Sequence, residues 1–103
     1  MKKINVIAVL LSLALVSPLG HAGDAAAGKA AFNGKGCAAC HGKTGKEPIA
    51  ANYPVIGGKS ADFIAGELNK FRAGERQDPT MSAMAGLLSD ADVANIAAFL
   101  ASQ

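Results

Sequence analysis

The segment from Lys35 to Lys43 reads KGCAACHGK, and it decides how the rest of the chain is interpreted. It holds both cysteines of the chain, Cys37 and Cys40, separated by two residues, and His41 follows directly. Cys-x-x-Cys-His is the signature of covalent haem attachment, but a Cys-x-x-Cys pair also occurs in redox dithiols and in zinc sites. The surrounding sequence has to distinguish these possibilities.

Residues 1–22 have the pattern of a secretory signal peptide. A basic start at Lys2 and Lys3 is followed by an apolar run from Val6 to Val16 and by small residues up to Ala22. A helix that spans a bilayer needs about 20 apolar residues, and this run is shorter. We therefore expect cleavage after Ala22, export to the periplasm, and no stable insertion in the membrane.

The predicted mature chain, residues 23–103, is long enough for one small domain. Cleavage removes two of the ten basic residues, which leaves eight basic and eight acidic residues, so no basic surface for a nucleic-acid partner is expected. It also removes His21, so His41 is the single histidine of the mature chain. A domain of this size with no tryptophan buries a marginal core, and a bound cofactor would complete it.

The apolar pattern predicts three helices and no strands. We expect them over residues 24–32, from Ser60 to Gly74, and from Ser89 to the C-terminus, with Asp24 and the two serines as N-caps and Gly74 as a C-terminal stop. Two long loops, residues 42–59 and 75–86, connect them. Residues with helical spacing are expected to form the core; they are Ile64, Leu68, Phe71, Val93, Ile96, Ala97, Phe99 and Leu100. Long loops in so small a domain indicate that something else organises them.

Haem attachment is the interpretation that uses all three side chains of the motif. A dithiol oxidoreductase requires an α/β domain with strands, and a tetrahedral zinc site requires four ligands where only three are present. A disulfide between Cys37 and Cys40 would close too small a loop to stabilise the fold much. We expect one haem c, with thioethers to Cys37 and Cys40 and with His41 as an axial ligand of the iron.

A second axial ligand has to come from another residue type, because no second histidine remains. The two methionines of the mature chain, Met81 and Met84, are the candidates, and their thioether sulfur suits low-spin haem iron. Methionine also serves as a filler of apolar cores. The residues alone do not choose between the two.

Residues 24–103 resemble the class I c-type cytochromes, most closely the small periplasmic monohaem cytochromes c of proteobacteria. The shared order is an N-terminal helix, CAACH, a loop, a middle helix, a methionine-bearing loop and a C-terminal helix that starts LSDAD. The resemblance implies an all-α fold of three main helices packed around one covalently bound haem, with long irregular loops. In that family the ligand methionine precedes the leucine of this segment by seven positions, which selects Met81 over Met84.

The resemblance also implies roles for residues outside the motif. Pro54 matches the proline whose carbonyl accepts a hydrogen bond from the ligand histidine, although it lies one residue further along than is usual. Gly28 and Phe32 match the place where the N-terminal helix crosses the C-terminal helix, at Ile96 and Phe99.

The function implied is that of a soluble periplasmic electron carrier, a monomer and not an enzyme, working between respiratory partners. A dehydrogenase or another cytochrome would be the donor, and a terminal oxidase or reductase the acceptor. Lys35, Lys43 and Lys46 flank the motif and are candidates for a docking patch. Two alternatives stay open: a haem with a labile methionine that acts as a small-ligand sensor or peroxidase-like enzyme, and a cytochrome subunit of a larger redox complex.

Overall fold

The computed structural model describes residues 23–103, and the expected signal peptide over residues 1–22 lies outside the described residues. Five helices follow one another in this part of the chain: α1 (Ala25–Gly34), α2 (Cys37–His41), α3 (Ala61–Ala73), α4 (Pro79–Ala85) and α5 (Asp90–Ala101). The same residues contain no strand. The expected all-α class with three main helices, α1, α3 and α5, is confirmed.

The caps of the three main helices lie where the sequence predicts them. The side chain of Asp24 accepts hydrogen bonds from the first turn of α1, and Ser60 does the same for α3. Gly74 ends α3 in the left-handed conformation, with φ of 80°. Ser89 and Asp92 form a capping box at the start of α5, in which each side chain accepts a hydrogen bond from the other residue's backbone N–H.

The capping box also makes the stability of the fold depend on pH. The hydrogen bond from the Ser89 backbone is the main cause that lowers the pKa of Asp92 below its ordinary value of 3.8. A lowered carboxyl pKa stabilises the fold above the ordinary pKa, and that contribution is lost as the pH falls through the lowered pKa. Oδ2 of Asp92 also forms an ion pair with Nζ of Lys35, at the end of α1, at a distance of 3.8 Å.

The loop over residues 75–86 was expected to be irregular, and this prediction is wrong in part, because residues 79–85 form α4. The pair Asp78-Pro79 is typical of a turn, but here Asp78 is the N-cap of α4 and Pro79 is its first residue. Proline is favoured at that position because its missing N–H would have no partner there and its φ suits a helix. The residues that follow are mostly good helix formers.

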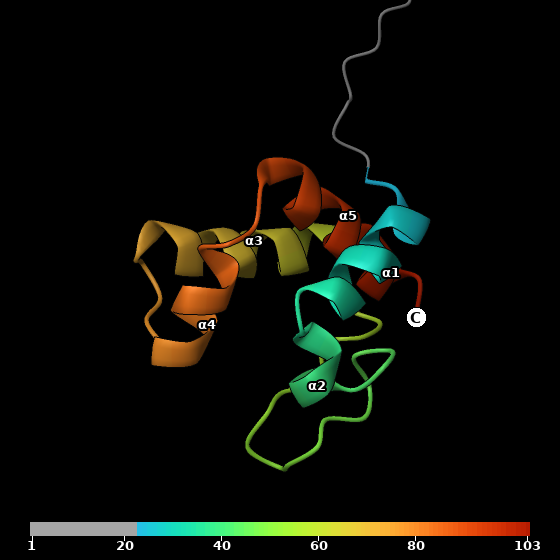
Figure 1. Cartoon of the computed structure of the whole chain (residues 1–103), viewed down its shortest axis with the longest axis horizontal. Helices are drawn as coiled ribbons and strands as arrows, with labels where there is room; N and C mark the ends of the chain where they lie inside the picture. The colour runs from blue at the N-terminus through green and yellow to red at the C-terminus, as the bar shows by residue number, and fades with distance from the viewer. Residues whose placement is uncertain (1–22) are drawn as a thin grey trace, which may run out of the picture.

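Helices α1 and α5 cross at close range and form the centre of the fold, with α3 packed against the other side of α5 (Figure 1). Gly28 makes this approach possible, because a Cβ there would lie 1.8 Å from the backbone oxygen of Asn95 and 2.9 Å from Cβ of Phe99. The rings of Phe32 and Phe99 meet one turn further on, with 5.4 Å between their centroids. The predicted crossing of Gly28 and Phe32 with the segment of Ile96 and Phe99 is confirmed, and the backbone of Asn95 also lies against Gly28.

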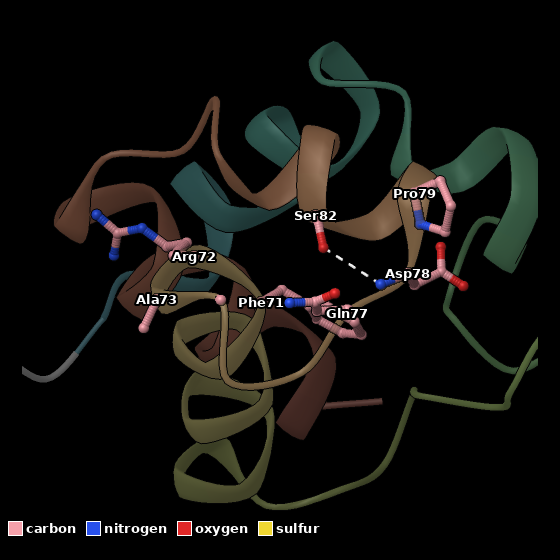
Figure 2. A pocket seen from close by; sticks show the side chains of 8 residues that line it. Phe71, Arg72, Ala73, Gln77, Asp78, Pro79 and Ser82 are labelled. Carbon is pink, nitrogen blue, oxygen red and sulfur yellow. Dashed lines mark hydrogen bonds between the residues drawn. The ribbon is translucent and has the colours of Figure 1, made fainter.

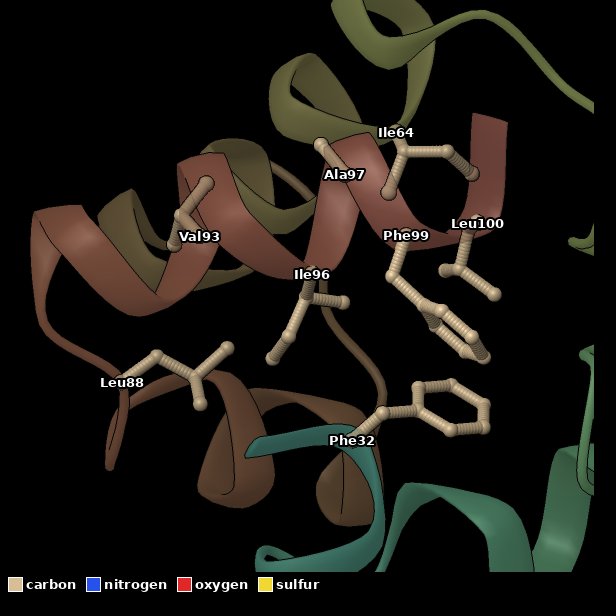
Figure 3. Close-up of a cluster of buried hydrophobic side chains, with 8 residues drawn as sticks. All are labelled: Phe32, Ile64, Leu88, Val93, Ile96, Ala97, Phe99 and Leu100. Atoms are coloured by element: carbon tan, nitrogen blue, oxygen red, sulfur yellow. The ribbon is translucent and has the colours of Figure 1, made fainter. Parts of the chain in front are cut away.

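The core is small and is built around α5: Figure 3 shows Ile96 and Phe99 on the side of Phe32, and Ala97 on the side of Ile64. Its members are Phe32, Ile64, Leu88, Val93, Ile96, Ala97, Phe99 and Leu100. Leu68, which the sequence pattern also assigned to the core, is only partly buried and packs against this cluster. Within residues 23–103 no single helix is long and apolar enough to cross a membrane. The pair α4 and α5 has the length and composition of a membrane span when taken together, but the two helices are bent by 112° relative to each other.

The long loop between α2 and α3 is held at several points by backbone hydrogen bonds. The carbonyl of Gly45 accepts from the N–H groups of Ile56 and Gly57, at 2.8 and 2.9 Å, which ties the two ends of the loop together. Gly58 N–H donates to the carbonyl of Leu100 at 2.8 Å and fastens the loop to the end of α5. The loop is thus attached to the core next to the end of α2.

Candidate functional site

Helix α2 brings Cys37, Cys40 and His41 onto a little more than one helical turn. Gly36, with φ of 85°, precedes the helix, and Gly42, with φ of 88°, ends it. A Cβ at Gly42 would also lie 2.4 Å from the backbone oxygen of Glu47, so a larger residue would disturb the loop that folds back here. The two cysteines are half-buried and are not joined in a disulfide, and His41 is buried.

His41 is held by the loop that returns from α2. Its Nδ1 lies 3.2 Å from the backbone oxygen of Pro54, a hydrogen bond in which a protonated Nδ1 donates. The ring of Tyr53 stands edge-on to the imidazole, with 6.2 Å between the ring centroids. Only 7% of the His41 surface is exposed, and it is the one polar or charged residue that is buried among residues 23–103. The bond to Pro54 fixes the ring and leaves its other nitrogen, Nε2, as the available donor of an electron pair.

Apolar side chains stand exposed beside His41. Ile49 and Val55 expose 67% and 47% of their surface. Both lie next to the site, because Ile49 N–H donates to the carbonyl of Cys40 at 3.0 Å and Val55 follows Pro54 directly. Such side chains are ready to contact a large apolar group. The buried imidazole, the two unpaired thiols and this apolar surround fit a haem.

The state of the thiols argues against a dithiol oxidoreductase. Burial raises the pKa of the Cys37 thiol more than a backbone hydrogen bond lowers it, and the neighbouring Cys40 adds the smallest effect, also upward. The attacking cysteine of a dithiol enzyme instead has a lowered pKa, because the thiolate is the nucleophile. Within the described part of the chain, no group of three or more histidine, cysteine, aspartate or glutamate side chains is arranged to hold a metal ion.

The two candidate methionines both lie on α4, three residues apart, and are therefore neighbours on the helix surface. Both are half-buried. The terminal methyl carbon of Met84 lies 3.7 Å from the position that a Cβ of Gly36 would take, so the Met84 side chain lies beside the start of α2. The backbone N–H of Met81 donates to the Asp78 side chain at 2.9 Å.

The three lysines around the motif are exposed but do not share one environment. Lys35 faces Asp92, whereas Lys43 and Lys46 lie in the loop after α2. The sequence interpretation assigned Asp78 only to a turn, and it did not single out Glu67, which pairs with Arg76. The signal for Asp78 is present in the sequence, because aspartate before proline is a frequent start of a helix.

A comparison with known proteins assigns the chain to a family. The model of the cytochrome c family matches residues 25–103. The chain is 38% identical to a cytochrome c4 of Pseudomonas aeruginosa over 97 residues, which are 94% of this chain and 47% of that protein. It is 41% identical to cytochrome c-554(548) of Halomonas halodenitrificans over 85 residues, which are 80% of this chain and 99% of that protein.

Solved structures agree with the sequence comparison. A cytochrome c4 of Acidithiobacillus ferrooxidans, described in connection with complex-induced tuning of electron transfer, superposes with a TM-score of 0.70 at 30% identity. The match covers 77% of this chain and 49% of that chain. The chain thus spans about half the length of the cytochrome c4 relatives and nearly the whole of cytochrome c-554(548).

Proposed function

The chain belongs to the cytochrome c family, whose members carry covalently attached haem c, and from this premise we propose that it is a one-electron carrier of the periplasm. The observation that carries the proposal is the buried His41, whose Nδ1 is held by the Pro54 carbonyl at 3.2 Å in the same helical turn as both thiols. Cys37 and Cys40 would hold the porphyrin through thioethers. His41 and Met81 would be the axial ligands of the iron.

When bound, the haem supplies a couple that takes up and releases a single electron. The residues of this chain set the conditions for that transfer. The Pro54 carbonyl accepts the hydrogen bond of His41 Nδ1, which keeps the tautomer with Nε2 free and makes Nε2 a stronger electron donor. Burial of His41 keeps water away from this side of the site, so that the ligand neither exchanges nor takes up a proton during the cycle.

Met81 would complete the ligand set. A thioether donates less electron density than an imidazole, and a histidine–methionine pair therefore favours the reduced iron and raises the potential. The position of Met84 beside the start of α2 supports a packing role for Met84 and leaves Met81 as the ligand. With both axial sites filled by the protein, no substrate would reach the metal, which distinguishes a carrier from a sensor or a peroxidase-like enzyme.

The docking of redox partners would use the surface around α2. The exposed Lys43 and Lys46 lie in the loop after α2 and would contribute to this surface. Weak electron-transfer encounters use small interfaces, which fits a surface of this extent. A dehydrogenase or another cytochrome as donor, and an oxidase or reductase as acceptor, are the classes of partner that we propose.

Carbon monoxide added to the reduced protein tests the carrier function. We expect low-spin absorption spectra in both oxidation states at neutral pH and no change in the reduced spectrum within seconds of mixing. Cyanide added to the oxidised protein should likewise react slowly. A high-spin spectrum at neutral pH, together with immediate binding of carbon monoxide, would contradict the carrier and favour a sensor or a peroxidase-like enzyme.

A further inference from the structure

The first turn of α4 is held by the side chain of Asp78. Its Oδ1 accepts hydrogen bonds from the backbone N–H groups of Thr80 and Met81, at 3.0 and 2.9 Å. In the opposite direction, the backbone N–H of Asp78 donates to Oγ of Ser82 at 3.3 Å (Figure 2). The cap therefore binds directly to the backbone of Met81, the axial ligand of the proposed function.

One side of this turn is open and not packed against other side chains. An open depression of about 680 Å³ lies between the last turn of α3 and the first turn of α4, and it is lined in part by Asp78, Pro79 and Ser82 (Figure 2). It contains none of the residues of the α2 motif. The buried residue of α4 is Ala85, at the far end of the helix. Packing thus holds the end of α4, and hydrogen bonds hold its beginning.

The segment that leads into α4 is attached to α3. The backbone N–H groups of Glu75 and Arg76 both donate to the carbonyl of Lys70, at 2.9 and 3.2 Å. The guanidinium of Arg76 pairs with Glu67 and lies 4.6 Å from the centroid of the Phe71 ring. Movement of the first turn of α4 is therefore limited on one side by this anchor and on the other by the burial of Ala85.

We propose that Asp78 is the positioning residue of Met81: its cap keeps the first turn of α4 closed and thereby holds the methionine on the iron. The proposal rests on the proposed function, because it takes Met81 as the ligand. Without the cap, the first N–H groups of α4 lose their partners and the turn frays. Conformations in which the Met81 side chain has left its place then become more populated, and a competing ligand replaces it more readily.

A titration of the oxidised holoprotein with imidazole tests this role. Displacement of methionine is followed at the charge-transfer band of the methionine–iron bond, at the red end of the spectrum. Asp78→Ala should lower the imidazole concentration at half-displacement by about fivefold, the equivalent of the loss of one helix cap. Asp78→Asn keeps an acceptor oxygen at the same place and should titrate within about twofold of the wild type.

Asp24 provides a matched control, because it caps α1 in the same way. Its Oδ1 accepts from the N–H groups of Ala26 and Ala27, at 2.9 and 3.1 Å. Asp24→Ala should lower the thermal stability about as much as Asp78→Ala and leave the imidazole titration unchanged. The proposal is overturned if Asp78→Ala titrates like the wild type, or if Asp24→Ala shifts the titration equally.

A third variant separates this proposal from the proposed function. If Met81→Ala retains the methionine–iron band, the ligand assignment is wrong and the role of Asp78 falls with it. If Met81→Ala loses the band and Asp78→Ala titrates like the wild type, the ligand assignment stands and only the positioning role is wrong.

Discussion

Met81→Ala is expected to abolish the charge-transfer band of the oxidised protein and to lower its reduction potential by more than about 60 mV, a factor of ten in the one-electron equilibrium. The physical reason is the loss of the thioether, which binds reduced iron better than oxidised iron. Water or a hydroxide would take the vacated position. Visible spectroscopy and a redox titration of the purified holoprotein measure the two effects.

Met84→Ala is the matched control for this prediction. Met84 lies one helical turn further along α4 and is half-buried beside Gly36, so its truncation would remove buried apolar surface and leave the ligand in place. We expect the band to remain and the thermal stability to fall by an amount typical of a partly buried methionine, about 1–2 kcal/mol. Loss of the band in Met84→Ala and its retention in Met81→Ala would reverse the assignment.

Gly28→Ala is expected to destabilise the fold more than any exposed substitution. The new Cβ would lie 1.8 Å from the backbone oxygen of Asn95, which belongs to the rigid helix α5, so the two helices would have to separate. Overpacking of this kind costs typically about 1–3 kcal/mol, and a clash with backbone lies at the upper end. We expect a loss of about 3 kcal/mol, measured by denaturant unfolding of the holoprotein.

Gly66→Ala is the control, because Gly66 also lies inside a helix, α3, but a Cβ there meets nothing within 4 Å. Alanine is the better helix former at an exposed position of this kind, by roughly 0.5–1 kcal/mol. The two substitutions, chemically identical, should therefore change the free energy of unfolding in opposite directions. Equal stabilities of the two variants would show that α1 and α5 do not cross as closely as described.

The sequence predicts the main helices because their signals are local. Asp24, Ser60 and Ser89 cap the helices they precede, and the apolar residues of α5 repeat with the helical period. The motif on α2 is equally local, since its three residues lie within five consecutive positions on little more than one helical turn. Its chemistry can therefore be interpreted from the order of the residues alone.

The features that the sequence did not predict depend either on contacts between distant segments or on a residue pair that occurs in two kinds of local structure. Asp78-Pro79 is common both in turns and at helix starts, and only the helix formers that follow it favour α4. That the backbone of Asn95 lies against Gly28 could not be predicted, because such a contact between crossing helices leaves no trace in the composition of either helix. Which methionine would bind the iron is likewise a matter of three-dimensional position, since both lie on one short helix.

Covalent attachment of the haem at Cys37 and Cys40 is the central claim, and a pyridine haemochrome assay after acid–acetone extraction tests it most directly. The protein is produced with the machinery that attaches haem c, extracted, and dissolved in alkaline pyridine with a reductant. We predict that the haem stays with the protein, at one per chain, and gives the spectrum of a haem with two thioether bonds. Haem that moves into the acetone, or a protein that carries none, would contradict the account.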